Sequence, residues 1–327
     1  EVLRVASHRW HRAYQWSYLW AQSRSTAPKG LPEVSAVERC SERVVRVLGG
    51  NPGQFQLQGT NCYLVGTGKR RVLVDCGEGK SGFLVNLERA MQESGAEGLD
   101  AVLITHAHLD HVGGVSQLRR RFGKDLRVLK YPTTEERVLK DEFDPLEDGA
   151  VVETEGATLR AVFTPGHSAD HLCFVLEEEQ AVFAGDNVLG SGSTVFEKLG
   201  DYLRSLQRMI SLAPAILYPG HGPVLYDGAV AKIEEYLAHR TKREAQIVRA
   251  LEERRREWCS LKELVRAVYP PLSPMLRMAA AYNVRNHLDK LREDGRVLAK
   301  EASFFGLLAP MRFALAHSPD EAPASTI

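Results

Sequence analysis

The sequence predicts a layered α/β architecture, followed by a small module of three helices and a strand pair. Short apolar, β-branched runs alternate with helical patterns between about residues 36 and 220, which is typical of sheets covered by helices. The chain has 327 residues, enough for one large domain and a smaller one. After residue 241, three helical segments precede a strand pair, which is the order of a winged-helix module.

The larger domain is predicted over residues 36–240. Residues 41–48 alternate apolar residues and end at a turn-forming Gly-Gly-Asn-Pro-Gly run, so they predict a strand. Apolar residues at spacings of three and four predict a helix over 83–94. The other elements predicted here are strands at 61–65, 71–75, 101–105, 126–130, 150–152, 158–163, 172–177, 181–185 and 215–218, and helices at about 114–122 and 202–211.

The winged-helix-like domain is predicted over residues 241–310. Ser260 with Glu263 three residues later is a capping box, which marks the start of a helix. The Ala-, Ser- and Pro-rich residues 311–327 predict a disordered tail. The elements predicted are a helical stretch over 228–258 with one break near 239–242, helices over 261–268 and 275–293, and a strand pair over 296–308 that turns near 302–303.

Composition and charge narrow the class of protein. No run approaches 18 consecutive apolar residues, so neither a transmembrane span nor a membrane partner is predicted. The five cysteines are scattered without a Cys-x-x-Cys pair, which favours a reducing, intracellular setting over a disulfide framework. Residues 36–240 carry 22 Lys and Arg against 29 Asp and Glu, whereas residues 241–300 carry 14 against 8. The basic C-terminal part indicates either an anionic partner or simply a solvated helical surface.

Residues 1–35 are predicted to be an N-terminal extension. The first 29 residues contain five Lys and Arg, several serines and a single acid, Glu1. An Arg-rich, Ser-containing and acid-poor composition is typical of an organelle transit peptide. A plain extension explains the segment equally well.

The most informative segment is His106-Ala107-His108-Leu109-Asp110-His111. It follows the apolar run 101–104, so these side chains are expected where a buried strand ends. Imidazole and carboxylate groups are suited to zinc or a similar first-row metal. Four such groups within six residues exceed what one tetrahedral ion with an open position needs. The spacing therefore predicts a two-metal site that is completed by residues from later in the chain.

Three later residues have the same chemistry and the same place at a strand end. His167 follows the predicted strand 158–163, Asp186 ends the strand 181–185, and His221 follows the strand 215–218. A glycine lies next to each of them, which allows the backbone to approach a site closely. We expect these residues to complete the metal site.

These motifs together resemble the metallo-beta-lactamase superfamily. The resemblance rests on Asp75 in Val-Leu-Val-Asp, the His106–His111 segment and the three later residues, and it covers roughly residues 36–240. It implies an αββα sandwich with two Zn²⁺ per subunit, and Asp75 would orient a ligand by hydrogen bonding. In the implied ligand set, one ion is held by His106, His108 and His167, the other by Asp110, His111 and His221, and Asp186 bridges them.

The implied chemistry is hydrolysis. Two divalent cations that share a bridging water lower its pKa and present hydroxide to an electrophile. The residues expected to be catalytic are Asp110, a ligand that can also steer the nucleophile, and the bridging Asp186. No general acid for the leaving group is evident.

Sequence blocks around the ligands resemble the beta-lactamase-like protein 2 family of the glyoxalase II-like group. That family implies a zinc-dependent endoribonuclease of single-stranded RNA in the mitochondrial matrix, with the cytoplasm as the alternative location. Cys62 and Cys76 stand where relatives usually have Thr, and Ala107 and Leu109 replace bulkier or charged residues. The blocks are Asn51–Gly53, Leu57–Gly66, Glu155–Arg160, Thr194–Glu197 and Tyr218–Pro223, and the resemblance extends to about residue 300.

Two other functions stay open. Fungal polyketide thioesterases share the Leu-Gln-Gly-Thr-Asn block, so a zinc-dependent thioester hydrolase acting on acyl-carrier, coenzyme A or glyoxalase II-like substrates is one alternative. A non-catalytic nucleic-acid-binding protein is the other, although the complete ligand set argues against it. Basic runs are candidate RNA contacts, although a single run of this kind is more often a solvated surface, and aromatic side chains are candidate contacts or equally parts of a core. These candidates are Arg119–Lys124, Arg254–Arg256, Arg277, Arg285, Trp258, Tyr282, Phe304 and Phe305.

Overall fold

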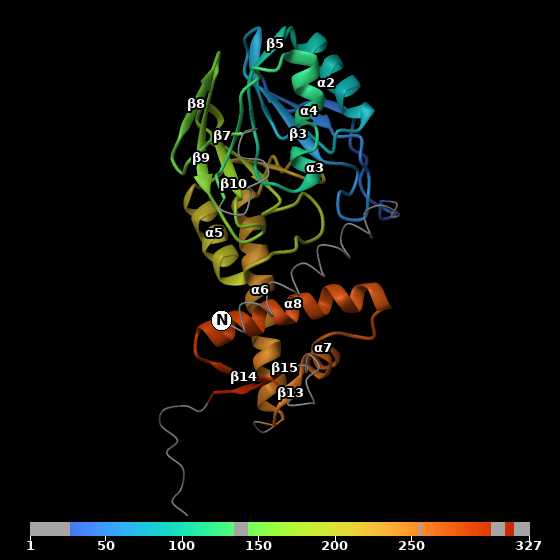
Figure 1. Cartoon of the computed structure of the whole chain (residues 1–327), viewed down its shortest axis with the longest axis vertical. Helices are drawn as coiled ribbons and strands as arrows, with labels where there is room; N and C mark the ends of the chain where they lie inside the picture. Colours follow the sequence, from blue (N-terminus) through green and yellow to red (C-terminus); the bar gives the residue numbers. More distant parts are fainter. Residues whose placement is uncertain (1–26, 134–142, 255–256, 302–310, 317–327) are drawn as a thin grey trace, which may run out of the picture. The chain divides into compact units, whose positions relative to one another are not determined.

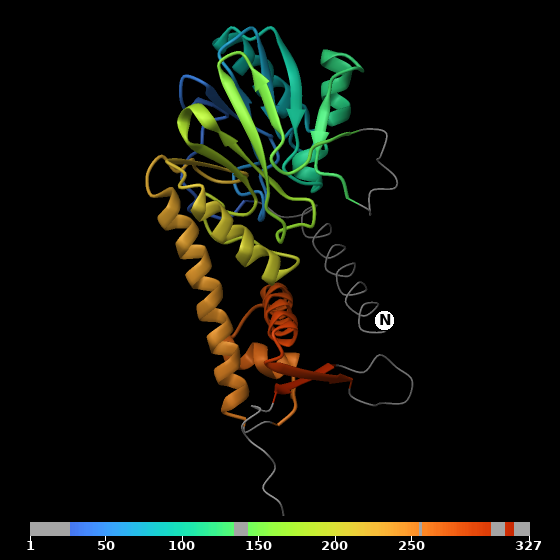
Figure 2. The ribbon, with the colours of Figure 1, turned by 90° about the vertical axis from the view of Figure 1, so that its left-hand side faces the viewer.

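The computed structural model describes residues 27–133, 143–254, 257–301 and 311–316 (Figures 1 and 2). The chain divides into two compact units. The first ends at Tyr236, and the second begins at Leu237 and also takes in Lys198–Gly200. Among the described helices, none has both the length and the apolar character needed to cross a membrane.

The first unit contains a seven-stranded sheet whose strands follow chain order. Its first four strands are antiparallel, and its last four are parallel to one another. Parallel neighbours need crossovers, and helices α2 (Ser81–Ser94) and α4 (Val115–Phe122) lie in two of them. The strands are β1 (Val37–Arg39), β2 (Val44–Leu48), β3 (Asn61–Val65), β4 (Arg70–Val74), β5 (Gly98–Leu103), β6 (Val128–Lys130) and β7 (Asp144–Pro145).

A five-stranded sheet packs against the first sheet. Leu103 of β5 and Phe174 and Phe183 of the second sheet belong to one buried cluster, so the two sheets share an apolar interior. Its strands lie in the order β12-β11-β10-β9-β8. Their bounds are β8 (Val151–Thr154), β9 (Ala157–Phe163), β10 (Leu172–Leu176), β11 (Ala181–Gly185) and β12 (Ile216–Pro219).

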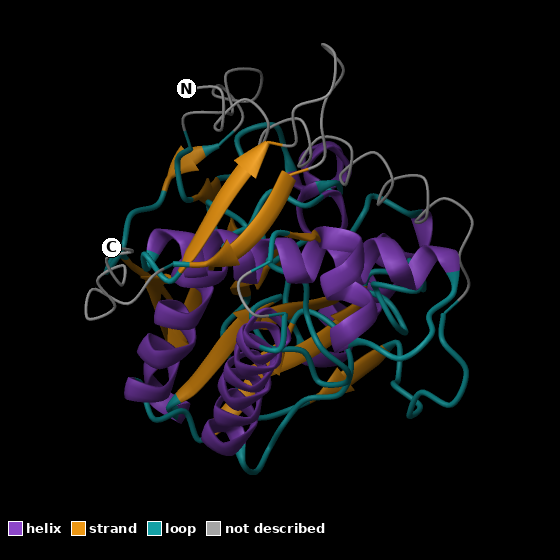
Figure 3. Ribbon diagram, turned by 90° about the horizontal axis from the view of Figure 1, so that it is seen from below, coloured by secondary structure: helices purple, strands orange, loops and turns teal. Residues whose placement is uncertain are grey.

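Helices cover the outer faces of both sheets. Leu73 of β4 packs with Phe83 of α2 and Leu118 of α4 in a second buried cluster. On the other side, Cys173 Sγ of β10 lies 3.8 Å from Met209 Sδ of α5 (Leu199–Ser211). The order helix, sheet, sheet, helix confirms the expected αββα sandwich, and its strands and helices can be followed in Figure 3.

The second unit has the elements of a winged helix. Ser260 Oγ accepts a hydrogen bond from the Glu263 backbone N–H, and the Glu263 carboxylate accepts one from the Ser260 N–H at 2.8 Å, which confirms the capping box. Its three strands form an antiparallel sheet in the order β13-β15-β14. The elements are α6 (Ala229–Glu252), which begins in the first unit, β13 (Cys259–Ser260), α7 (Leu261–Val268), α8 (Pro274–Glu293), β14 (Val297–Glu301) and β15 (Met311–Leu315).

Two sequence predictions are wrong in this unit. Helix α6 runs unbroken through residues 239–242, and within it the Thr241 hydroxyl donates to the Leu237 carbonyl one turn earlier at 3.1 Å, a bond that a continuous helix tolerates. The predicted disordered tail begins with strand β15, because Phe313 is fully buried in the core of this unit. The second strand of the pair therefore lies at 311–315. The predicted turn at 302–303 and most of the N-terminal extension lie outside the described residues.

Candidate metal centre

The loops that follow five strands meet at one edge of the sandwich. Strands β4 and β5 are parallel, as are β11 and β12, and β9 runs in the same direction as β11 because both are antiparallel to β10. Their carboxyl ends therefore lie at the same edge of each sheet. Asp75 follows β4, the His106–His111 segment follows β5, and His167, Asp186 and His221 follow β9, β11 and β12.

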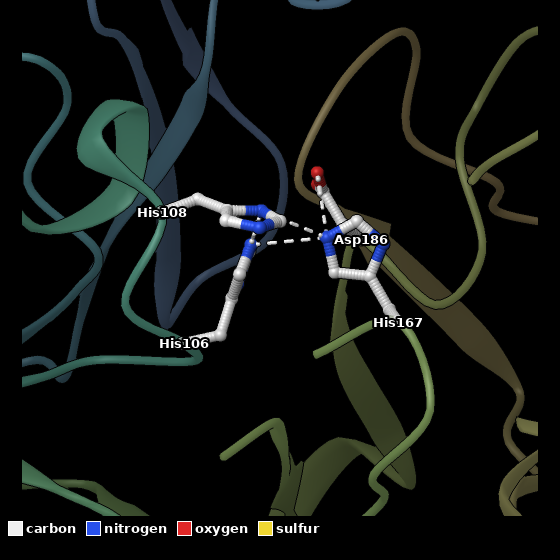
Figure 4. Close-up of side chains that lie close together, drawn as sticks. All are labelled: His106, His108, His167 and Asp186. Carbon is white, nitrogen blue, oxygen red and sulfur yellow. Dashed lines mark hydrogen bonds and ion pairs between the residues drawn. The ribbon is translucent and has the colours of Figure 1, made fainter. Parts of the chain in front are cut away.

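Three histidines converge on one point at this edge, and we call them, with Asp186, the first cluster. His106 Nε2 lies 2.8 Å from His108 Nδ1, and His167 Nε2 lies 3.2 Å and 3.0 Å from the same two atoms. The Oδ2 atom of Asp186 lies 3.6 Å from His167 Nε2. Figure 4 shows these four side chains pointing toward one another.

Hydrogen bonds to the far side of the rings decide which nitrogen carries the proton. The Val195 carbonyl lies 2.8 Å from His167 Nδ1, and a carbonyl only accepts, so the proton is on Nδ1. The Thr105 hydroxyl donates to Asp75, so the oxygen of Thr105 accepts from His106 Nδ1 at 3.0 Å. Both Nε2 atoms therefore present lone pairs to the same point, which suits a cation.

The second cluster lies beside the first and consists of Asp110, His111 and His221. His221 Nε2 lies 3.2 Å from Asp110 Oδ2 and 3.3 Å from Asp186 Oδ1. His111 Nε2 lies 3.4 Å from the same Asp186 oxygen. The two oxygens of Asp186 therefore face different clusters, Oδ2 the first and Oδ1 the second.

Asp75 holds His111 from behind. Its Oδ2 lies 2.7 Å from His111 Nδ1, and its carboxylate also accepts the backbone N–H and the hydroxyl of Thr105, each at 2.8 Å. Asp75 has a left-handed backbone conformation with φ of 58°. Asp110 and His111 lie in a short helix, α3 (Leu109–Val112). The expected orienting role of Asp75 fits these contacts.

The histidine pKa values are shifted in opposite directions in the two clusters. Burial and the neighbouring histidines lower the pKa of His106 well below its ordinary value, and burial together with His108 lowers the pKa of His167 to about 4. Burial acts in the same direction on His221, but the Asp186 and Asp110 carboxylates outweigh it and raise its pKa to about 9. The histidines of the first cluster are thus neutral, whereas His221 of the second cluster is protonated beside the Asp110 and Asp186 carboxylates.

The donor atoms at this edge fit divalent metal ions. The Nε2 atom of His111 and the Oδ1 atom of Asp186 are buried and lie 3.4 Å apart, but neither makes a hydrogen bond. Leaving such atoms unpaired in a protein interior is costly, and a cation placed among them would remove that cost. Imidazole and carboxylate sets of this kind suit zinc and similar ions.

Several contacts of the centre have no obvious signal in the sequence. The carbonyl of Val195 is a backbone atom that any residue supplies, and Thr60 donates weakly to Asp110 Oδ2 at 3.4 Å. His171 is a fully buried histidine beside His106, with ring centroids 5.2 Å apart, and it was not among the predicted site residues. Its only sequence signal is its position four residues after His167.

The remaining candidate residues are distributed over both units. Cys62 and Cys76 are fully buried, whereas Ala107 and Leu109 are exposed beside the ligands. Of the candidate RNA contacts, Arg121, Arg254 and Arg285 form ion pairs with Glu88, Glu263 and Asp289. Lys300 lies over the ring of Trp258, 4.0 Å from its centroid. Arg255, Arg256, Phe304 and Phe305 lie outside the described residues.

Comparisons with families and known proteins agree with this geometry. Residues 56–221 match the Metallo-beta-lactamase superfamily model, and residues 260–304 match the Beta-lactamase associated winged helix domain. A beta-lactamase domain protein from Burkholderia ambifaria has the same fold, with a TM-score of 0.71, 21% identity, and 90% of this chain and 98% of that chain covered.

Similar proteins with curated names include several kinds. Lactamase-like protein adaB of Aspergillus niger is 41% identical, covering 85% of this chain and 89% of its own length. A Beta-lactamase-like protein 2 homolog of Caenorhabditis elegans is 42% identical, covering 82% and 90%. An Atrochrysone carboxyl ACP thioesterase of Aspergillus fumigatus is 46% identical, covering 73% of each chain. The chain belongs to the metallo-beta-lactamase superfamily and is a metal-dependent hydrolase with a C-terminal winged-helix domain.

Proposed function

We propose that this protein is a zinc-dependent endoribonuclease that hydrolyses phosphodiester bonds of single-stranded RNA. The observation that carries the hydrolytic part of the proposal is the position of Asp186, whose two oxygens face the two clusters. The clusters would then hold two ions side by side, with Asp186 between them. Two such metal ions would activate water and take up the charge that develops on the attacked and leaving oxygens of a phosphodiester.

The protein's own side chains would orient this centre rather than transfer protons to the leaving group. Histidines lower the pKa of Asp110 and Asp186 despite their burial, so both carboxylates are ionised and neither can donate a proton. Asp110 lies on the same side of the centre as His111 and His221, where it would steer the nucleophile. Since neither carboxylate can protonate the leaving group, its negative charge would have to be stabilised electrostatically by the bound cations.

RNA as the substrate is supported by sequence and charge. The blocks around the ligands resemble the beta-lactamase-like protein 2 family. The C-terminal residues 241–300 carry an excess of six positive charges, the difference between 14 Lys and Arg and 8 Asp and Glu. Phosphate backbones are bound chiefly by Lys and Arg, so this surplus suits a nucleic-acid substrate. For the same reasons we propose single-stranded RNA as the partner.

Thioester hydrolysis is the second candidate. It is favoured by the 46% identity to the Atrochrysone carboxyl ACP thioesterase of Aspergillus fumigatus. A thiolate is a better leaving group than an alkoxide, so the same centre could act on thioesters without a general acid. The metal centre by itself does not separate the two substrates, and one protein preparation must be offered both.

The test compares purified zinc-loaded protein on unstructured RNA and on an acyl thioester. We expect internal cleavage of the RNA and its loss in His108→Ala, because His108 supplies a first-cluster nitrogen. His239→Ala, which changes an exposed histidine of α6, is the matched control and should cut normally. Intact RNA together with rapid thioester hydrolysis would establish the second candidate instead.

We also propose the mitochondrial matrix as the compartment, on the composition of residues 1–29. Residues 1–35 fused to a fluorescent protein should direct it to mitochondria. A version in which the five Lys and Arg are replaced by Gln should stay diffuse. A diffuse signal from the unaltered fusion would contradict the assignment.

A further inference from the structure

His171 lies behind the metal centre and belongs to neither cluster. It is fully buried and immediately precedes strand β10. Its ring lies next to that of His106, and its Nε2 atom faces the backbone of Asp186. None of the roles proposed above uses this side chain.

The hydrogen bonds of His171 determine its role. The Asp186 backbone N–H donates to His171 Nε2 at 3.2 Å, so that nitrogen is the acceptor and the proton is on Nδ1. His171 Nδ1 lies 3.0 Å from the Thr164 hydroxyl oxygen, which accepts because its own hydrogen points to Cys173 Sγ at 3.3 Å. At one end the ring thus contacts the Thr164 hydroxyl and the Asn187 side-chain amide, whose Nδ2 lies 3.1 Å from Nδ1, and at the other it holds the backbone of Asp186.

The backbone at residue 185 fits closely against the same nitrogen. Gly185 has a left-handed conformation with φ of 48°, and a Cβ atom there would lie 2.5 Å from His171 Nε2. From the other side, the Gly220 N–H donates to the Gly185 carbonyl at 2.7 Å. The peptide that precedes Asp186 is therefore held between His171 and the loop that carries His221.

We infer that His171 is a positioning residue that fixes the backbone from which the Asp186 carboxylate reaches both clusters. Each cluster has three other ligand residues, so it keeps most of its donors when Asp186 shifts. What depends on the position of Asp186 is the simultaneous occupation of both clusters. His171 should therefore affect the affinity for the second ion to bind, when the other cluster is already occupied, more than the affinity for the first. The inference concerns metal binding and holds for either substrate.

The test measures bound zinc per chain as free zinc is varied, with the full-length protein and no substrate. His171→Leu removes the acceptor, and we expect the second zinc ion to bind about 10- to 100-fold more weakly, the usual effect of losing a group that supports a ligand. His171→Gln can place an oxygen near the Nε2 position, so it should recover most of the affinity. Val175→Ala, a buried change on β10 away from these contacts, should lower the melting temperature without changing zinc binding.

Two results would overturn the inference. One is His171→Leu protein that binds both ions with the affinity of the wild type, whatever its melting temperature. The other is His171→Gln protein that is as defective as His171→Leu, because the acceptor would then not be what matters. If His171→Leu does not fold, Thr164→Val replaces it, and unchanged zinc affinity in that variant also counts against the role. Because no RNA is used, the outcome is independent of the proposed nuclease activity.

Discussion

The two clusters of the metal centre use the same kinds of side chain but differ in charge and in how they are supported. In the first cluster, neutral imidazoles converge, and the His167 ring is oriented by the backbone carbonyl of Val195. In the second, the pKa of His221 is raised by the Asp110 and Asp186 carboxylates, and His111 is oriented by the Asp75 side chain. The first cluster can therefore receive a cation without losing a proton, whereas the second must release protons to do so.

Asp186 is the element that the clusters share, so its substitution should have the largest effect. Asp186→Asn removes the charge that faces both clusters, and we expect hydrolysis to fall on the order of 100- to 1000-fold, as when a key electrostatic group is lost. Hydrolysis rates should be measured at saturating zinc. Wild-type rates in this variant would show that the two clusters do not act as one centre.

Asp75 should separate the clusters. It contacts His111 directly but His106 only through Thr105, so Asp75→Asn should weaken the second cluster first. We expect the second zinc ion to bind about 10- to 100-fold more weakly while the first changes less. Asn accepts the left-handed conformation found at this position, so the backbone should be kept. Zinc titration by isothermal calorimetry measures both steps, and equal losses in both would contradict the difference.

The pH dependence of zinc binding should differ between the clusters. The pKa of His167 is lowered to about 4, and burial also lowers the pKa values of His106 and His108, so the first ion should meet little competition from protons and its affinity should change little between pH 5 and 8. The pKa of His221 is raised to about 9, so this ring is protonated at pH 7 and a cation must displace that proton. Below pH 9, affinity for the ion in the second cluster should therefore fall roughly tenfold for each unit by which the pH is lowered, for each proton displaced. Above pH 9 this affinity should no longer depend on pH. Two identical pH profiles would refute this difference.

A pair of threonines gives the smallest expected effect. The Thr60 hydroxyl donates to Asp110 Oδ2 at 3.4 Å, so Thr60→Val should weaken the second ion by roughly 2- to 10-fold, the worth of one hydrogen bond. Thr194 lies 3.2 Å from His167 Nδ1, but that nitrogen already donates to the Val195 carbonyl. Thr194→Val should therefore leave the first ion almost unchanged. Competition for zinc with a chromophoric chelator measures both affinities. A larger loss of zinc affinity in Thr194→Val than in Thr60→Val would contradict the role assigned to these two hydroxyls.

Much of the candidate site could be predicted from the sequence because its side chains are chemically distinctive. Histidines and aspartates at strand ends are recognisable, and parallel strands bring their carboxyl ends to one edge. The Val195 carbonyl could not be predicted, since every residue carries one. His171 was missed because a histidine that accepts from a backbone N–H resembles any buried histidine in sequence.

The fold was predicted well where burial determines the pattern and poorly where composition was used instead. Strands such as β10 are apolar throughout and lie between two layers, so their positions were clear. The Ala- and Pro-rich composition after Met311 concealed strand β15, which pairs with the preceding strand β14 and with the more distant strand β13. The polar run at 239–242 likewise concealed the continuity of α6, within which the Thr241 hydroxyl bonds the carbonyl one turn earlier.

The central claim is that the two clusters form one dinuclear centre that cuts RNA. The most direct measurement is the rate of single-stranded RNA cleavage as zinc is added back, in equivalents per chain, to metal-free protein. We expect little cleavage up to the first equivalent and a steep rise between the first and the second. Full activity with a single equivalent, or no cleavage with both sites filled, would contradict the claim.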